Sequence, residues 1–391
     1  MRKNMPSIPK EEYRERWKSV QNLMKEKNLD LLFAYSDDHA TFGPAYTRWL
    51  GNFPPHFEVA CVMMGKDKGP ALLTGPESED YALDFGEIED VYILEEFTHP
   101  NEDFLYSNIV SLRHVADNLV GLENIKRIGI AGRDLMGADA YIKFQKALPD
   151  TEWIDVDYDT AVLRGVKTEA EKAVIKYAYE LAHRGMLTAI DTINAGVPER
   201  TVAAEVEYVM RKAGSEGVGI DTMIASGVKS KNIISRTTFK EIQKNDLVHV
   251  TIAPRYEGYH GAIARPIFVG EPTDKAKYAL DAAIEAMNAT ADALRPGVEG
   301  REVEAIGREV MNKAGLGECF KYSGIHSIGV MEFEPPIFGP TQPDILEKDM
   351  IVSIDIPVFG LPWGGFRIED GFLITDNGFE RLTNIDHVII K

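Results

Sequence analysis

Residues Asn245–Phe268 read NDLVHVTIAPRYEGYHGAIARPIF, and this stretch predicts a β-hairpin. Two runs rich in Val, Ile, Thr and Tyr flank the segment Pro254–Gly258, whose Pro and Gly are typical of a turn. Thr251 and Ala262 stand eleven residues apart, so the pattern predicts that they lie opposite each other on one face of a sheet.

His249 and His260 lie on the same predicted face as Thr251 and Ala262. His249 stands two residues before Thr251, and His260 stands two residues before Ala262. The same register places His249 opposite Ala264. It places His260 opposite Ala253, toward the other end of the hairpin, so we do not expect the two imidazoles to bind one ion together. Each histidine either hydrogen-bonds a neighbouring strand or solvent, or takes part in catalysis. His249 is the better candidate for a base, because alternate residues of its strand are expected to point into a pocket.

The frame of this hairpin resembles that of the pita-bread family, which includes methionine aminopeptidase, aminopeptidase P, prolidase, creatinase and the ectoine hydrolases. The matching positions are Asp246, Val248, Gly258, Tyr259 and Arg265. In the metal-dependent members two aspartates of this frame bind metal. Here Thr251 and Ala262 stand at those two positions.

Three further motifs follow in the order that the family has. They are Gly324–Val330 with His326 at the histidine ligand, Lys348–Asp355 with Asp355 in place of the first glutamate, and Gly364–Asp370 with Glu369 at the last glutamate. The resemblance spans roughly Ala161–Lys391 and implies a pita-bread catalytic domain.

The loss of both hairpin aspartates bears directly on metal binding. Two divalent ions about 3.5 to 4 Å apart need anionic oxygens between them, and neither Thr251 nor Ala262 supplies one. We therefore expect no two-metal centre and no required cofactor. If one divalent ion binds, the resemblance implies that its ligands are His326, Asp355 and Glu369.

Two more positions depart from the family. Ile234 stands where the family has a histidine before the hairpin, on which creatinase relies as a base, and Phe333-Glu334 replaces the His-Glu pair of the peptidases. The resemblance therefore implies neither an ordinary aminopeptidase nor an ordinary creatinase.

His326, Asp355 and Glu369 are the predicted catalytic residues. The two carboxylates can hold an amidinium, a guanidinium or an amine, while a neutral His326 moves a proton to or from the leaving nitrogen. The leading interpretation is a hydrolase that acts on a non-peptide C–N bond of a small polar substrate, as creatinase and the ectoine hydrolases do. The alternatives are a one-metal Xaa-Pro peptidase-like hydrolase and a catalytically silent binding protein on the same fold.

Further polar residues of the same motifs are predicted to bind substrate, and most of them have a structural alternative. They are His249, Tyr259, Glu334 and Arg367. Tyr259 can simply pack, and Glu334 can be a loop carboxylate before Pro335-Pro336. Asp355 lies in an apolar run, where a lone carboxylate is costly, so a structural salt bridge is its alternative.

Composition excludes several classes of partner. The chain has 62 Asp and Glu against 43 Lys and Arg, and its net charge of -19 repels nucleic acid and anionic membranes. Cys61 and Cys319 are far apart and suggest neither a disulfide framework nor a cysteine-based zinc site. The N-terminus lacks an apolar signal region, and no apolar run is long enough to span a bilayer, so a cytoplasmic location is expected.

We expect an α/β (α+β) chain with a creatinase-type N-terminal domain built on a small mixed sheet, residues 1–160, and a pita-bread catalytic domain, residues 161–391. The expected helices are Pro9–Lys27, Asp103–Leu119, Leu135–Ala147, Glu169–Asn194, Glu199–Ala213, Asp274–Leu294 and Arg301–Ala314. The expected N-terminal strands are Leu31–Tyr35, Val59–Met64, Ala71–Thr74, Val91–Leu94 and Arg127–Ala131. Thr168 is the expected cap of the fourth helix.

Residues Phe42–Phe57 concentrate aromatic side chains in a Pro- and Gly-rich stretch that predicts a binding loop, with a packed domain edge as the alternative. In creatinase-like relatives the N-terminal domain of one subunit closes the other's active site. The resemblance therefore implies a homodimer in which Arg48 or His56 grips a substrate carboxylate.

Overall fold

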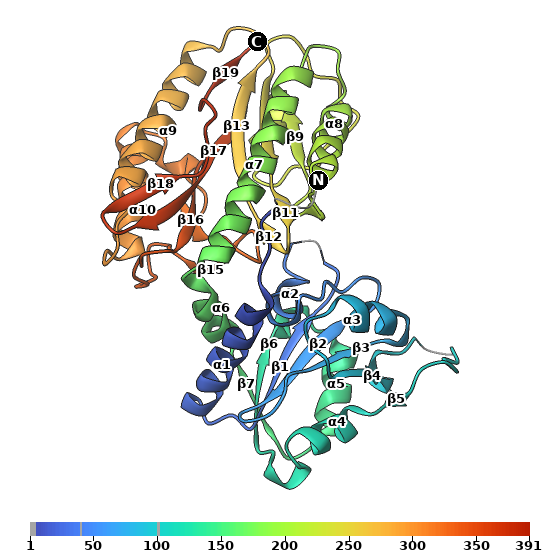
Figure 1. Cartoon of the computed structure of the whole chain (residues 1–391). Coiled ribbons are helices and arrows are strands. Elements are labelled where there is room, and N and C mark those ends of the chain that lie inside the picture. The colour runs from blue at the N-terminus through green and yellow to red at the C-terminus, as the bar shows by residue number, and fades with distance from the viewer. Residues whose placement is uncertain (1–4, 40, 100–101) are drawn as a thin grey trace. The chain divides into compact units, whose positions relative to one another are not determined.

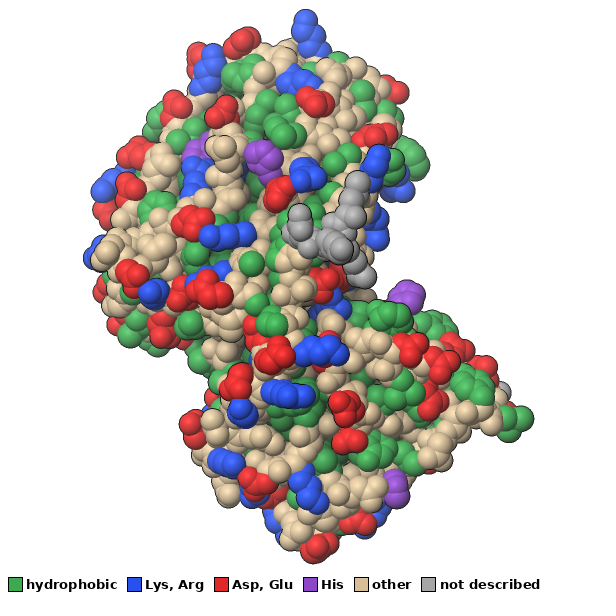
Figure 2. Space-filling view, in the orientation of Figure 1, with side chains coloured by type: hydrophobic (Ala, Val, Ile, Leu, Met, Phe, Trp, Pro, Cys, Tyr) green, Lys and Arg blue, Asp and Glu red, His purple; other side chains and the backbone are tan. Residues whose placement is uncertain are grey.

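A computed structural model describes residues 5–39, 41–99 and 102–391. The chain divides into two compact units, Ile8–Leu163 and a second unit formed by 164–391 together with the described residues 5–7 (Figure 1). On the face drawn in Figure 2, acidic and basic side chains are interspersed, and the basic ones do not gather into a single patch.

The N-terminal unit is a seven-stranded sheet with helices packed on it, in the order β5-β4-β3-β2-β1-β6-β7. Its strands are β1 Leu31–Ser36, β2 Ala60–Gly65, β3 Ala71–Thr74, β4 Val91–Leu94, β5 Ile109–Val110, β6 Arg127–Ala131 and β7 Glu152–Asp155. Its helices are α1 Lys10–Glu26, α2 Ala45–Gly51, α3 Glu79–Phe85, α4 Leu112–Leu119, α5 Ala138–Ala147 and α6 Asp157–Gly165, the last of which leads into the second unit. Phe33 and Phe144 lie at the centre of its core.

Two expectations for this unit are wrong. The helix expected over Asp103–Leu119 begins only at Leu112, because β5 takes up Ile109–Val110 and the Ser111 side chain accepts a hydrogen bond from the backbone of His114 as an N-cap. The expected loop Phe42–Phe57 contains helix α2, whose aromatic residues are buried in the unit.

The second unit is built on a nine-stranded sheet whose main path is β15-β14-β16-β17-β13-β10-β9. Its strands are β8 Gly217–Val218, β9 Met223–Ser226, β10 Leu247–Ile252, β11 Pro254–Tyr256, β12 Tyr259–His260, β13 Ile263–Phe268, β14 Ile325–Ser327, β15 Glu334–Ile337, β16 Ile351–Leu361, β17 Gly364–Thr375, β18 Gly378–Arg381 and β19 Ile389–Ile390. Its helices are α7 Glu169–Thr192, α8 Glu199–Lys212, α9 Asp274–Asp292 and α10 Gly300–Lys313. Thr168 caps α7 in a capping box with Glu171, as expected.

Residue alternation separates the two faces of this sheet. On β16, Ile354 lies in the apolar core formed with α9 and α10, whereas Ser353 and Asp355 point to the opposite face. On β17, Ile368 lies in the same core and Glu369 points away from it. The polar candidates therefore share the face that turns away from α9 and α10 (Figure 1).

The expected register of the hairpin is wrong. Thr251 pairs with Ala264 and not with Ala262. The segment between the two long strands forms its own small hairpin, β11 and β12, which pairs with β8 in a separate three-stranded sheet. Gly261 then packs on α7, where an added Cβ would lie 2.5 Å from the backbone nitrogen of Tyr179. The shift is two residues, so each side chain keeps its face.

Because of this register shift, the two hairpin histidines also lie opposite other residues than expected. His249 lies opposite Pro266, and His260 lies opposite Arg255 in the small sheet, instead of the alanines expected. They lie in different sheets, in agreement with the expectation that they do not share an ion.

No helix in the described part of the chain is long and apolar enough to cross a membrane.

Candidate active site

The three predicted catalytic residues lie on three neighbouring strands. Asp355 on β16 is directly opposite Glu369 on β17, and His326 on β14 is opposite Ser353, two residues before Asp355. All three side chains are buried. The sheet thus brings one imidazole and two carboxylates to the same face.

The backbone fixes the orientation of His326. Its Nδ1 lies 2.9 Å from the carbonyl oxygen of Ser327, which can only accept, so Nδ1 carries the proton. The other nitrogen, Nε2, lies 4.0 Å from Oε1 of Glu369. The Phe333 ring lies beside the imidazole at 4.5 Å between centroids. His326 therefore directs Nε2 toward Glu369.

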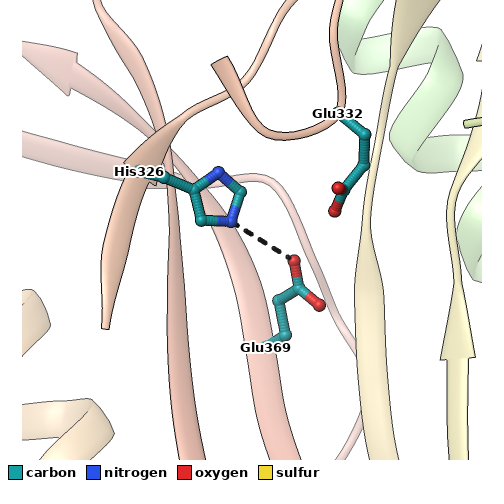
Figure 3. A group of neighbouring side chains, drawn as sticks. All are labelled: His326, Glu332 and Glu369. Carbon is teal, nitrogen blue, oxygen red and sulfur yellow. Dashed lines mark ion pairs between the residues drawn. The ribbon is translucent and has the colours of Figure 1, made fainter. Parts of the chain in front are cut away.

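Glu332 joins this pair, although the sequence interpretation passed over it. The candidate ligand atoms of His326, Glu332 and Glu369 all lie within 4.8 Å of one another (Figure 3). Burial raises the pKa of the Glu332 carboxyl. Burial also raises the pKa of Glu369 well above its usual range, and the negative charges of Asp355 and Glu332 add to that shift. The sequence does offer one signal for Glu332, because it is the only acidic residue in the apolar run Ile328–Phe333.

Asp355 is engaged elsewhere. Its Oδ2 accepts hydrogen bonds from Arg367 Nη1 at 3.0 Å and from the Tyr322 hydroxyl at 2.8 Å. Arg367 Nη2 also donates to the carbonyl of Ile233 at 3.3 Å. Asp355 is not a member of the three-residue cluster, and its Oδ1 has no hydrogen-bond partner among residues 5–39, 41–99 and 102–391. The salt bridge weighed as its structural alternative is present.

His249 occupies the region of the vacated aspartate position. Its Nε2 is hydrogen-bonded to the Thr251 hydroxyl at 3.0 Å, and its ring packs edge-on against Phe359. Burial, and then the positive charge of Arg367, lower its pKa well below the usual range, so the imidazole is neutral. Its Nδ1 is buried without a hydrogen-bond partner in the described part of the chain.

The other predicted substrate-binding residues make scaffold contacts. Glu334 pairs with Lys167 at 2.8 Å and with Arg164 at 3.5 Å, all three side chains being buried. The Tyr259 hydroxyl donates to Glu171 at 2.7 Å.

Residues Arg48 and His56 belong to the N-terminal unit. Arg48 Nη1 lies 3.4 Å from the carbonyl of Asn52, and His56 is exposed. Ile234, at the family's histidine position before the hairpin, is 71% exposed.

The side chains present fit one divalent ion better than two. His326, Glu332 and Glu369 offer one nitrogen and two carboxylates, and Oε2 of Glu369 is a buried oxygen with no partner in the described residues. Thr251 and Ala262 supply none of the anionic oxygens that would have to lie between two ions.

Comparison with known proteins agrees with this architecture. The model of "Metallopeptidase family M24" matches residues 173–376, and that of "Creatinase/Prolidase N-terminal domain" matches residues 16–166. The Xaa-Pro dipeptidase of Pyrococcus horikoshii is 32% identical over 337 residues, which cover 85% of this chain and 95% of that protein.

Solved structures give the same result. The prolidase from Pyrococcus furiosus superposes with a TM-score of 0.79 at 26% identity, covering 94% of this chain and 99% of that one. The Xaa-Pro dipeptidase from Bacillus anthracis superposes with a TM-score of 0.80 at 26% identity, covering 98% and 100%. The expected α/β architecture and the resemblance to the pita-bread proteins are thereby confirmed: this chain belongs to metallopeptidase family M24 and carries a creatinase/prolidase-type N-terminal domain.

Proposed function

We propose that this protein hydrolyses the amide bond of small Xaa-Pro substrates such as dipeptides, with at most one divalent ion. The observation that carries the proposal is the buried group formed by His326 and Glu369 on motif-matched strands, together with the relatives named Xaa-Pro dipeptidase. These relatives favour the peptidase alternative over the non-peptide C–N hydrolase that was the leading interpretation of the sequence.

We assign a different part of the substrate to each polar group of the site. His326, Glu332 and Glu369 would hold a divalent ion, which when bound would supply Lewis-acid chemistry at the scissile carbonyl. Asp355 Oδ1, buried and without a hydrogen-bond partner in the described chain, is suited to accept an N–H of the substrate. The neutral imidazole of His249 offers Nδ1 as the atom that exchanges a proton with the substrate nitrogen.

Apolar rings lie next to these polar atoms. Phe333 packs beside His326, and Phe359 packs beside His249. A pyrrolidine ring is a compact apolar group that can pack against such aromatic faces, which agrees with a proline-containing substrate.

A second candidate is hydrolysis of a non-peptide C–N bond, as in creatinase or the ectoine hydrolases. The observation that favours it is the triple departure at Thr251, Ala262 and Phe333, where the peptidases of the resemblance have two metal ligands and a histidine. A site without the second ion suits a substrate that is easier to activate than a peptide.

Activity assays on one panel separate these candidates. The full-length protein, with Mn²⁺ or Co²⁺ added, is incubated with Xaa-Pro dipeptides, proline-free dipeptides, creatine and ectoine, and the products are identified by mass spectrometry. We expect turnover of Xaa-Pro dipeptides that is lost in E369Q and kept in E318Q, a matched change of an exposed glutamate. Cleavage of creatine or ectoine alone would move the assignment to the second candidate, and no cleavage in the panel would leave the silent binding protein as the better description.

We also propose a homodimer in which Arg48 or His56 of one subunit reaches the partner's substrate. The proposal rests on the aromatic segment Phe42–Phe57, whose end residues Phe42 and Phe57 are 41% and 63% exposed. Light scattering of the purified protein should give twice the chain mass of 43.6 kDa, and a monomer at micromolar concentration would contradict it.

A further inference from the structure

Three electron-pair donors converge in the second unit. They are Nε2 of His326 and carboxylate oxygens of Glu332 and Glu369, and Figure 3 shows these groups directed toward one another. The residues are 2%, 7% and 1% exposed, so the donors are shielded from bulk solvent.

The hydrogen bonds around these groups leave Nε2 of His326 and carboxylate oxygens facing one another. His326 Nδ1 donates to a backbone carbonyl, which leaves Nε2 on the side of Glu369. Glu369 Oε1 accepts a hydrogen bond from Ser353 at 2.9 Å, while Oε2 has no partner among the described residues. Buried acceptors at such distances need a proton or a cation between them.

The charges of the site favour a divalent cation. Arg367 compensates Asp355, and their contact is buried at 3.0 Å. The carboxyl groups of Glu332 and Glu369 then remain beside the imidazole of His326, and they carry two negative charges once an ion displaces their protons. One doubly charged ion balances them, and one nitrogen with two oxygens is a ligand set that zinc, manganese, iron and cobalt accept.

We propose that this chain binds one divalent transition-metal ion through His326, Glu332 and Glu369, with Glu332 as the ligand that takes the place of the missing aspartates. The inference deepens the proposed function, since the same ion would serve hydrolysis. It differs from the ligand set that the resemblance implies, because Asp355 is held by Arg367 and Tyr322 and lies outside the cluster.

The test is a binding measurement without substrate. The full-length protein is stripped with a chelator and dialysed against Co²⁺, and bound metal is counted by mass spectrometry and by the visible absorption of Co²⁺. We expect close to one equivalent for the wild type, with an affinity that falls by more than about 100-fold in E332Q, since loss of a supporting group alone costs 10–100-fold. D355N should still bind one equivalent, and E318Q, at the exposed residue of the short 3-10 helix Gly317–Cys319, should match the wild type.

Two results would overturn the proposal. One is wild-type Co²⁺ affinity in E332Q, and the other is loss of binding in D355N with binding kept in E332Q. Circular dichroism establishes that each variant is folded. Anomalous diffraction from wild-type crystals soaked in Mn²⁺ gives a readout without mutation, and an ion on Asp355 and away from Glu332, or no ion, also contradicts the proposal. Because no substrate is present, a wrong peptide assignment leaves the outcome unchanged.

Discussion

The free energy of unfolding of the second unit, residues 164–391 (the catalytic unit below), should fall as the pH is lowered from 8 to 5. The cause is His260, which gains a proton in the unfolded chain but stays neutral in the folded one. The ring is buried, its Nδ1 donates to the Gly329 carbonyl at 3.0 Å, and burial followed by the charge of Arg255 lowers its pKa to about 3. In the unfolded chain the ordinary value is about 6.5. A native pKa below the unfolded value means that the stabilisation is complete above pH 6.5 and is lost as the pH falls toward 3.

The size of the effect follows from one proton. Below pH 6.5 the unfolded chain binds it and the native protein does not, so the free energy of unfolding falls by about 1.4 kcal/mol per pH unit. Between pH 8 and pH 5 the loss is about 2 kcal/mol. This figure depends on the unfolded pKa and hardly changes as long as the native pKa stays well below 5.

The variant H260N keeps a side-chain N–H near the position of Nδ1 and removes the titration. Native-state hydrogen exchange of peptides from β14 and β16, on chelator-treated protein at pH 8 and pH 5, measures the stability of the catalytic unit apart from the N-terminal unit. The values at pH 8 give the fixed cost of the substitution. The stability difference between pH 8 and pH 5 should be smaller in H260N than in the wild type by about 2 kcal/mol. The same pH dependence in both proteins would refute the assignment of a neutral buried imidazole.

Three further changes test the scaffold around the site. The double variant T251D/A262D returns two carboxylates to the hairpin, and metal analysis should show the content rising from about one to about two equivalents, whereas an unchanged content would contradict the charge argument. R265M removes the fully buried one of the two arginines that pair with Asp370, at 2.6 Å, while Arg381 stays, and should lower the free energy of unfolding in urea by about 3 kcal/mol; a loss under 1 kcal/mol would mean that Arg381 alone compensates the Asp370 charge. K391M removes the ammonium group that caps the C-terminal carbonyls of α7 and should cost about 1 kcal/mol in the same titration, with no change expected if the chain end is frayed.

The helices and most strands could be predicted because their signals are local. Thr168 and the acidic residues after it mark the start of α7, and the apolar runs that form β16 and β17 carry their polar residues at alternate positions. The strand positions of His326 and Glu369 could be predicted in the same way, because each lies inside a recognisable strand motif, and their catalytic role stays a prediction.

Features that depend on distant contacts were missed. The hairpin register is set partly by Gly261, which packs against the backbone of α7, a contact between segments that the hairpin sequence does not encode. Glu332 lies between β14 and β15, in a segment whose sequence has no helix or strand periodicity. It lies near Glu369 because the sheet places β16 and β17 next to β14. The predicted roles of Arg48 and His56, the homodimer and the cytoplasmic location stay predictions.

The pairing of Asp355 with Arg367 has a consequence for how the proposed ion would enter the protein. Part of the site carries its own counter-charge, so the metal-free chain does not need an ion to hold β16, β17 and the Ile233 carbonyl in place. Folding could then be complete before metal arrives, and the proposed ion would enter a largely prepared site. A site built in this way would lose and regain its ion without unfolding of the chain.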